Sequence, residues 1–162
     1  MKIGVLTISD KGSRGERLDA SGEAIADAMR LAGAEVPCYA VIPDEKDLIC
    51  GKLKEWADSG QIDAILTTGG TGLGPRDVTP EATTAVIDRV VPGFTEAMRS
   101  ESLKKTPHAM LSRAVCGTRG TCLIINLPGS PKAVRECLAV VLPALPHAVD
   151  TIKGAGNECA EL

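Results

Sequence analysis

Apolar runs alternate along this chain with stretches in which apolar residues recur at helical spacing. The runs at 3–8, 62–67 and 122–127 are apolar at most successive positions, not at every second one. Such a pattern is typical of a strand whose two faces are both covered, as in a parallel sheet. We therefore predict an α/β fold, a three-layer sandwich with a mostly parallel sheet and helices on both faces.

The expected elements follow one another closely. Strands are expected at 3–8, 35–42, 62–67 and 122–127, and helices at 20–31, 45–56, 79–90, 94–104, 111–116, 131–141 and 143–152. A turn is expected at 117–120, and Pro37 favours an edge position for the second strand. The length predicts one domain over residues 1–153, followed by a C-terminal tail at 154–162.

The residues after the third strand carry most of the functional information. They run Thr-Thr-Gly-Gly-Thr-Gly-Leu-Gly-Pro-Arg-Asp-Val-Thr-Pro-Glu-Ala over 67–82. Glycines let a ligand approach the amides closely, and Thr79 and Pro80 suit the N-cap and first position of a helix. A strand, a glycine loop and a helix start together favour an anion site, with Arg76 and Asp77 placed for a phosphate and a metal ion. A tight turn without a ligand is the alternative.

Other candidate residues follow the remaining strands. Asn126–Lys132 resembles a second anion loop, with Ser130 as N-cap, although an ordinary strand-to-helix connection has the same pattern. Asp44 precedes a helix and is either its N-cap or a site carboxylate. Arg113, beside Ser112, is either a phosphate ligand or a solvated surface residue. Because ligands of parallel sheets bind at the carboxyl ends of the strands, we expect the loops at 7–10, 67–77 and 126–131 to converge.

Composition excludes several classes of function. The formal charge of −3 is spread without a basic stripe, and Phe94, Tyr39 and Trp56 are the only aromatic residues of their kinds, so nucleic-acid binding is not expected. The 6 cysteines form no C-x-x-C pair and are expected to be small buried hydrophobes. His108 and His147 lack metal-ligand spacing. No apolar run would span a bilayer, which predicts a cytoplasmic protein with no membrane partner.

Several of these motifs occur together in one family. The segments 67–72, 76–82, 112–113 and 126–132 all match the molybdopterin adenylyltransferases, which the chain closely resembles from residue 7 to its last helix. These are bacterial single-domain proteins of molybdenum-cofactor synthesis, related to the G domain of gephyrin. The resemblance implies the fold of molybdenum-cofactor-biosynthesis proteins and a homotrimer.

The resemblance also implies a reaction and its residues. The family transfers AMP from Mg-ATP to the terminal phosphate of molybdopterin and releases pyrophosphate. Asp77 and Asp44 match the acidic residues at the reacting phosphates, where Mg²⁺ is held through the substrates. Transient contact with other molybdenum-cofactor proteins is expected. The implied contacts to molybdopterin and ATP are Thr7, Ser9, Asp10, Gly69, Gly70, Thr71, Gly72, Arg76, Thr79, Pro80, Glu81, Ser112, Arg113, Asn126, Pro128, Gly129, Ser130 and Lys132.

Two other interpretations remain beside the enzyme. One is a homologue that binds molybdopterin with little or no activity, and the other is a trimeric scaffold in the same pathway. Asp77 and Asp44 favour the enzyme, because a scaffold has no need of carboxylates beside anion loops. Pyrophosphatases of competence-damage type have a similar glycine loop but lack the Arg-Asp-Val-Thr-Pro-Glu order. Weak support for a trimer comes from the apolar stretches at 86–87 and 90–91 beside Phe94, which one small domain would not fully cover.

Overall fold

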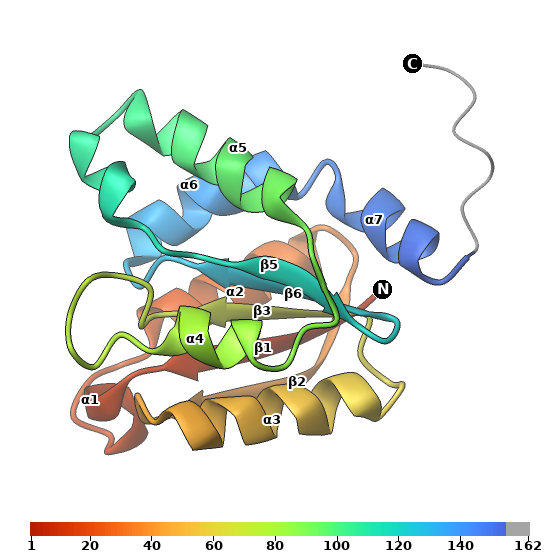
Figure 1. Cartoon of the computed structure of the whole chain (residues 1–162), viewed down its shortest axis with the longest axis horizontal. Coiled ribbons are helices and arrows are strands. Elements are labelled where there is room, and N and C mark those ends of the chain that lie inside the picture. Colours follow the sequence, from red (N-terminus) through yellow and green to blue (C-terminus); the bar gives the residue numbers. More distant parts are fainter. Residues whose placement is uncertain (155–162) are drawn as a thin grey trace.

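The computed structural model describes residues 1–154, which form a sheet between two layers of helices (Figure 1). The strand order is β2-β1-β3-β6-β5-β4. The first four strands in that order are parallel, whereas β5 and β4 join the edge antiparallel. The strands are β1 (Lys2–Ile8), β2 (Glu35–Ile42), β3 (Ala64–Thr68), β4 (Arg89–Val90), β5 (Cys116–Arg119) and β6 (Cys122–Leu127). The predicted mostly parallel α/β sheet is confirmed, and so is the edge position of the strand that holds Pro37.

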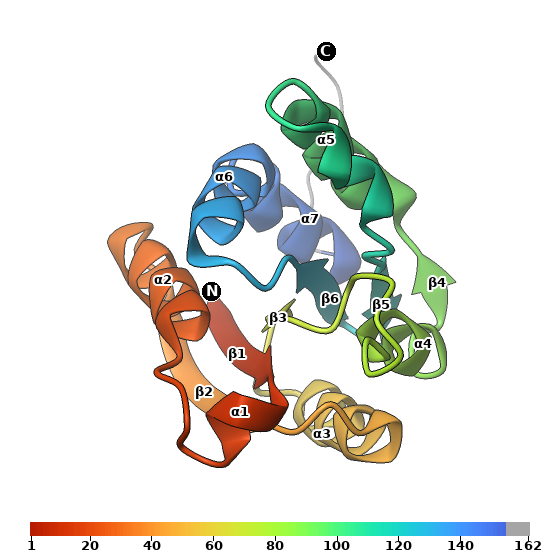
Figure 2. The ribbon, with the colours of Figure 1, turned by 90° about the vertical axis from the view of Figure 1, so that its left-hand side faces the viewer.

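Helices cover both faces of the sheet, as expected. The α-helices are α1 (Asp10–Ser13), α2 (Ala20–Leu31), α3 (Lys46–Asp58), α4 (Thr79–Thr84), α5 (Pro92–Leu103), α6 (Pro131–Val141) and α7 (Leu145–Ile152), and η1 (Pro107–Leu111) is a 3₁₀ helix. Figure 2 shows α2, α5, α6 and α7 on one face and α3 and α4 on the other. Within residues 1–154, no helix combines the length and apolar character needed to cross a membrane.

The continuous apolar pattern of the central strands follows from this double cover. In β1, Ile3 and Val5 pack against the layer of α2 and α6, while Leu6 and Ile8 pack against α3. Successive side chains of a strand point to opposite faces, so a strand covered on both sides must be apolar at successive positions. The same alternation between the two cores divides β3 and β6.

The expectations for residues 85–120 are partly wrong. The helix expected at 79–90 ends at Thr84, and the residues at its expected end form β4, because the amides of Asp88 and Val91 donate to backbone carbonyls of β5. The helix expected at 111–116 is wrong, because η1 ends at Leu111 and residues 112–115 form neither a helix nor a strand. Most of the turn expected at 117–120 belongs to β5, which pairs with β6 as a hairpin. β4 forms by pairing with residues of β5 that are distant in the sequence, which local periodicity does not encode, whereas β5 pairs with β6 across a short turn.

Two expected helix caps are also wrong, and one is confirmed. Asp44 does not cap α3, because that helix begins after Glu45 and has no side-chain cap. Thr79 lies inside α4, and its hydroxyl donates to the Gly69 carbonyl at 2.9 Å in place of capping the helix. Ser130 does cap α6, where its hydroxyl accepts from the Ala133 amide at 3.2 Å.

The described cysteines behave as small buried hydrophobes or partly buried residues. All five of them are free thiols; Cys116, Cys122 and Cys137 are buried. Burial raises the pKa of Cys116 and of Cys122 to about 12, so these thiols stay protonated at neutral pH. Cys159 and most of the expected tail lie outside the described residues.

Gly4 and Gly51 offer a matched test of this packing. A Cβ on Gly4 would lie 2.8 Å from the Trp56 ring, whereas nothing lies within 4 Å of a Cβ on Gly51, inside α3. Gly4→Ala should therefore destabilise the fold by about 1–3 kcal/mol through overpacking. Gly51→Ala should stabilise it by about 0.5–1 kcal/mol through helix propensity. Urea unfolding of both variants checks the opposite signs, and equal effects would contradict the packing of β1 on α3.

Candidate active site

The loops after β1, β3 and β6 lie together at one end of the sheet, which Figure 2 views end-on. β3 lies between β1 and β6 and is parallel to both. The Thr68 hydroxyl donates to the Pro128 carbonyl at 2.7 Å, and a Cβ on Gly129 would touch the Cα of Gly69 at 3.4 Å. The predicted convergence of these loops is confirmed.

The glycine loop leaves β3 in a conformation that a side chain would disrupt. Gly69 has a φ of +96°, and a Cβ there would lie 2.2 Å from the Ile8 carbonyl oxygen of β1. Within residues 1–154, the amides of Gly70, Thr71 and Gly72 donate no hydrogen bond to another backbone carbonyl. Amide groups free of partners are ready donors for the oxygens of an anion.

Arg113 holds this loop by hydrogen bonds to its backbone carbonyls. Its Nε donates to the Gly72 carbonyl at 2.6 Å, its Nη2 donates to the Asp77 carbonyl at 2.5 Å, and its Nη1 pairs with Glu81. The Arg113 amide also donates to the Thr71 carbonyl at 3.0 Å. The guanidinium lowers the pKa of Glu81 by hydrogen bonding. Arg113 is therefore committed to holding the loop, a role that sequence analysis did not weigh.

Asp44 and Asp77 approach the loop at different glycines. Asp77 Oδ2 accepts from the Gly74 amide at 2.8 Å, while Asp44 Oδ1 lies 3.2 Å from the position of a Cβ on Gly70. Burial raises the pKa of Asp44, and the negative charges of Asp10 and Asp77 raise it further. The Asp44 carboxylate is thus held in a place where a cation would stabilise its charged form.

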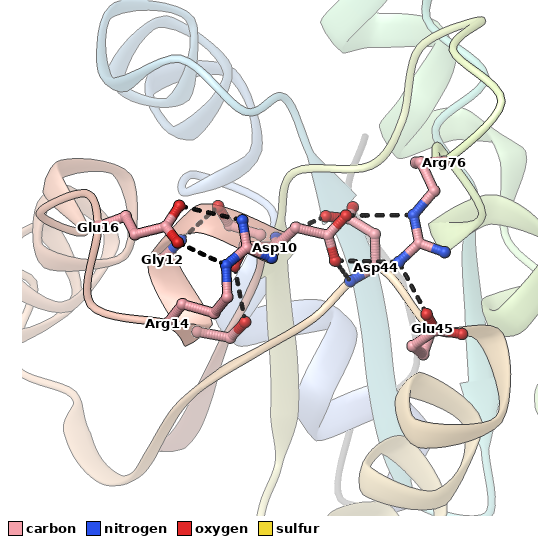
Figure 3. Close-up of polar contacts among 9 residues, drawn as sticks. Asp10, Gly12, Arg14, Glu16, Asp44, Glu45 and Arg76 are labelled. Atoms are coloured by element: carbon pink, nitrogen blue, oxygen red, sulfur yellow. Dashed lines mark hydrogen bonds and ion pairs between the residues drawn. The ribbon is translucent and has the colours of Figure 1, made fainter.

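Asp10 links Asp44 to Arg76, as Figure 3 shows. The Asp10 amide donates to Asp44 Oδ2 at 2.8 Å, and the Asp44 amide donates to Asp10 Oδ1 at 3.1 Å. Arg76 holds Asp10 through Nε and Nη2 at 3.1 and 3.0 Å and also pairs with Glu45 at 2.8 Å. The hydrogen bond from Arg76 lowers the pKa of Asp10. Sequence analysis missed Glu45, although it directly follows Asp44.

The donor set of Asp44 and Asp77 fits Mg²⁺ shared with substrate. Within residues 1–154, no group of three or more His, Cys, Asp and Glu side chains is arranged to hold a metal ion alone. Mg²⁺ is commonly held by one or two carboxylates together with substrate phosphates. The hard carboxylate oxygens of Asp44 and Asp77 lie beside the free loop amides and match that requirement.

Several of the predicted residues line one of two pockets. A pocket of about 290 Å³ lies toward α5 and α6, and one of about 220 Å³ lies beside the ends of β1 and α2. Predicted residues that line the larger pocket are Thr71, Gly72, Ser112, Asn126 and Pro128. Predicted residues that line the smaller pocket are Thr7, Ser9, Gly69 and Gly129.

Some predicted residues use their polar groups within the protein or are buried, so they have no group available to a ligand. The Asn126 side chain is fully buried; its Nδ2 donates to Thr67 at 3.0 Å and Thr83 at 2.9 Å, and its Oδ1 accepts from the Val115 amide at 3.1 Å. Asn126 therefore ties β6 to β3 and α4 while it borders the larger pocket. Pro80 is buried in the first turn of α4.

Lys132 is exposed on the first turn of α6, and the structure brings it to neither pocket. Sequence analysis also missed residues that line the pockets. Thr95, Met98 and Ser102 of α5 line the larger one, and Asp19 and Ser21 at the start of α2 line the smaller one. The pocket side of α5 has no local signal, because its pattern is that of any amphipathic helix. Asp19 could have been found, since an Asp before a helix is a recognisable N-cap.

Comparison with known proteins agrees with this arrangement. The model of a family described as a probable molybdopterin binding domain matches residues 4–147. The molybdopterin adenylyltransferase of Helicobacter pylori (strain ATCC 700392 / 26695) is 49% identical over 154 residues, which cover 94% of this chain and 88% of that protein. The gephyrin of Dictyostelium discoideum is 46% identical over 160 residues, which cover 93% of this chain and 22% of that protein.

A solved structure agrees as well. The crystal structure of the molybdopterin biosynthesis enzyme MoaB from Thermus thermophilus has a TM-score of 0.89 to this chain and 53% identity, and the match covers 96% of this chain and 98% of that one. The expected fold type and the resemblance to the molybdopterin adenylyltransferases are both confirmed. This chain belongs to the family of probable molybdopterin binding domains.

Proposed function

We propose that this protein is a molybdopterin adenylyltransferase, which transfers AMP from Mg-ATP to the terminal phosphate of molybdopterin in molybdenum-cofactor biosynthesis. Relatives of that name are up to 49% identical over most of the chain. The observation that carries the proposal is the position of Asp44 and Asp77 beside a glycine loop in which the amides of Gly70, Thr71 and Gly72 donate to no backbone carbonyl within residues 1–154. Carboxylates beside an anion loop suit phosphate chemistry assisted by a divalent cation.

The reaction joins two negatively charged phosphates. An oxygen of the molybdopterin phosphate attacks the α-phosphorus of ATP, a new P–O bond forms there, and the bond to the β-phosphate oxygen breaks to release pyrophosphate. Bound Mg²⁺ would offset the negative charge that gathers on these oxygens. Asp44 and Asp77 would hold it, and the hydrogen bonds that both carboxylates accept from backbone amides keep them in place.

The loop amides supply the other stabilising groups. The N–H groups of Gly70, Thr71 and Gly72 are fixed by the Arg113 brace, so they need little reorganisation to meet developing charge. Arg76 uses its Nε and Nη2 on Asp10 and Glu45, so a phosphate would bind through Nη1 unless it displaced those carboxylates.

The proposed reaction requires no nucleophile from the chain. The substrate phosphate itself attacks, so a covalent protein intermediate is unnecessary. The buried thiols of Cys116 and Cys122, whose pKa is raised to about 12, are poor candidates for such a role. The protein would act by positioning and by charge stabilisation.

We also propose a homotrimer, which the resemblance implies, and a cytoplasmic location, which the sequence pattern predicts. Val90 is 63% exposed on the edge strand β4, beside the half-buried Phe94 of α5, and would gain cover in an interface. Val86 is buried within the protomer and Ile87 is half-buried, so these residues give less support to a trimer than the sequence suggested.

Asp77→Asn should separate chemistry from folding. Asparagine keeps a carbonyl oxygen that can accept from the Gly74 amide but removes the charge that attracts the metal. We expect normal folding and pyrophosphate release reduced by at least about two orders of magnitude. Asp44→Asn should act similarly, because Asp44 does not cap α3. The assay uses purified molybdopterin and Mg-ATP, with Asp150→Asn on the exposed side of α7 as control.

Near-normal pyrophosphate release by a folded Asp77→Asn protein would reject this assignment. It would favour the alternative of a molybdopterin-binding homologue or a trimeric scaffold without catalysis.

Oligomeric state is tested independently. A cyclic trimer repeats one heterologous interface three times, and its mass should therefore be three times that of the 16.8 kDa chain. Light scattering at micromolar concentration should report that mass, and Val90→Glu should lower it by placing a charge in the interface. A stable monomer of the unchanged protein would contradict the proposal.

A further inference from the structure

Asp10 joins the segments that follow three neighbouring strands of the sheet (Figure 3). It begins α1 after β1, while Asp44 follows β2 and Arg76 lies on the loop after β3. Asp10 exchanges two hydrogen bonds with Asp44, and its carboxylate accepts two from Arg76. Just before this pair, the Ser9 amide donates to the Ile42 carbonyl at 2.8 Å, so the ends of β1 and β2 are fixed side by side.

The two oxygens of the Asp44 carboxylate have different surroundings. Oδ2 accepts from the Asp10 amide at 2.8 Å. Oδ1 lies toward the glycine loop, 3.2 Å from the position of a Cβ on Gly70, and it accepts no hydrogen bond from the described part of the chain. A hydrogen bond on one oxygen limits rotation of the whole carboxylate. Asp44 is therefore oriented with one oxygen open toward the loop amides.

The carboxylate of Asp10 has no such open oxygen. Its Oδ1 accepts from the Asp44 amide at 3.1 Å and from Arg76 Nη2 at 3.0 Å, and its Oδ2 accepts from Arg76 Nε at 3.1 Å. A cation at Asp10 would meet the positive guanidinium of Arg76. Asp44 and Asp77 form no ion pair with any residue in 1–154. The charge open to a cation is therefore that of Asp44 and Asp77.

The contacts of Asp10 also relate these two carboxylates to each other. Arg76 directly precedes Asp77 in the glycine loop, and its guanidinium is held on Asp10, which is bonded in turn to Asp44. Mg²⁺ demands near-ideal octahedral geometry, so two carboxylates that share it must keep a defined separation. Residues that fix this separation in advance reduce the cost of ordering the site when the cation binds.

We propose that Asp10 is a positioning residue, which sets Asp44 against Asp77 for a divalent cation shared with the substrates and binds neither cation nor substrate itself. The proposal rests on the proposed function, which supplies the phosphates that bring the cation. It assigns Asp10 a role different from the substrate contact that the resemblance implies.

The test measures cation binding without turnover. The probe is Mn²⁺ bound to α,β-methylene-ATP, in which a methylene group replaces the oxygen whose bond to the α-phosphorus must break. Mn²⁺ takes the same oxygen ligands as Mg²⁺, and water proton relaxation follows its binding to the protein. Asp10→Ala should bind the probe about tenfold more weakly, because Asp44 loses one of the two hydrogen bonds that fix it.

Glu16→Ala is the matched control. It removes a carboxylate from the segment just after α1, where the Glu16 side chain pairs with Arg14. The change in net charge is the same as in Asp10→Ala. This variant should bind the probe as tightly as the unchanged protein.

The conservative variant separates positioning from direct binding. Asp10→Asn keeps an oxygen that can accept from the Asp44 amide, although it gives up the charge that pairs with Arg76. It should therefore recover part of the loss and bind about threefold more weakly than the unchanged protein. A residue that held the cation through its own charge would lose as much in Asp10→Asn as in Asp10→Ala.

A double-variant cycle gives a second readout. In a protein that already carries Asp44→Asn, Asp10→Ala should cause no further loss, because no carboxylate remains to be positioned. Additive losses would instead indicate a direct contact of Asp10 with the probe or a general structural defect. Circular dichroism checks folding, and the same cycle with Asp10→Asn applies if Asp10→Ala does not fold.

Three results would overturn the proposal: full binding by a folded Asp10→Ala protein, additive losses in the double variant, and full binding by Asp44→Asn, which would then hold no cation. Pyrophosphate release is measured separately with the unchanged protein. Its absence would reject the proposed function while the expected pattern of probe binding still supported the role of Asp10. Normal release together with full binding by Asp10→Ala would have the reverse meaning.

Discussion

The parallel pairing of β1, β3 and β6 sets Thr7 opposite Thr68 and Thr68 opposite Leu127. Parallel strands end at the same edge of a sheet, so the loops that follow must share one small volume. That crowding accounts for the glycine at position 69, which lies against the Ile8 carbonyl of β1. The loop amides, the two aspartates and both pockets are placed by this single constraint.

The charged side chains of the site have two roles: some hold the glycine loop in place, and others are free to bind a cation. Arg113 uses its guanidinium on two loop carbonyls and on Glu81, and these contacts hold the loop in its position. Asp44, by contrast, lies where its negative charge is unfavourable, because burial and neighbouring carboxylates raise its pKa. The site thus contains a negative charge that a bound cation would stabilise. The residues around it are held by ion pairs and hydrogen bonds.

The sequence predicted the elements that local patterns encode. The apolar runs located the central strands, and the glycines with Asp77 located the loop at their ends. Pairing between distant residues could not be predicted in this way, as the pairing of β4 with β5 shows. Asp44 was assigned a possible capping role because its spacing fits one, yet its carboxylate accepts from the Asp10 amide across the site. Arg113 and Asn126 were likewise chosen by motif, while their partners depend on tertiary contacts.

The central claim is that the protein positions two substrates and forms no covalent bond itself. Its most direct test follows ATP labelled at the α-phosphate, incubated with the protein and Mg²⁺, with and without molybdopterin. The account predicts that the label moves into adenylyl-molybdopterin only when molybdopterin is present, and that none stays on the protein after denaturation. Label attached to the protein in the absence of molybdopterin would contradict it.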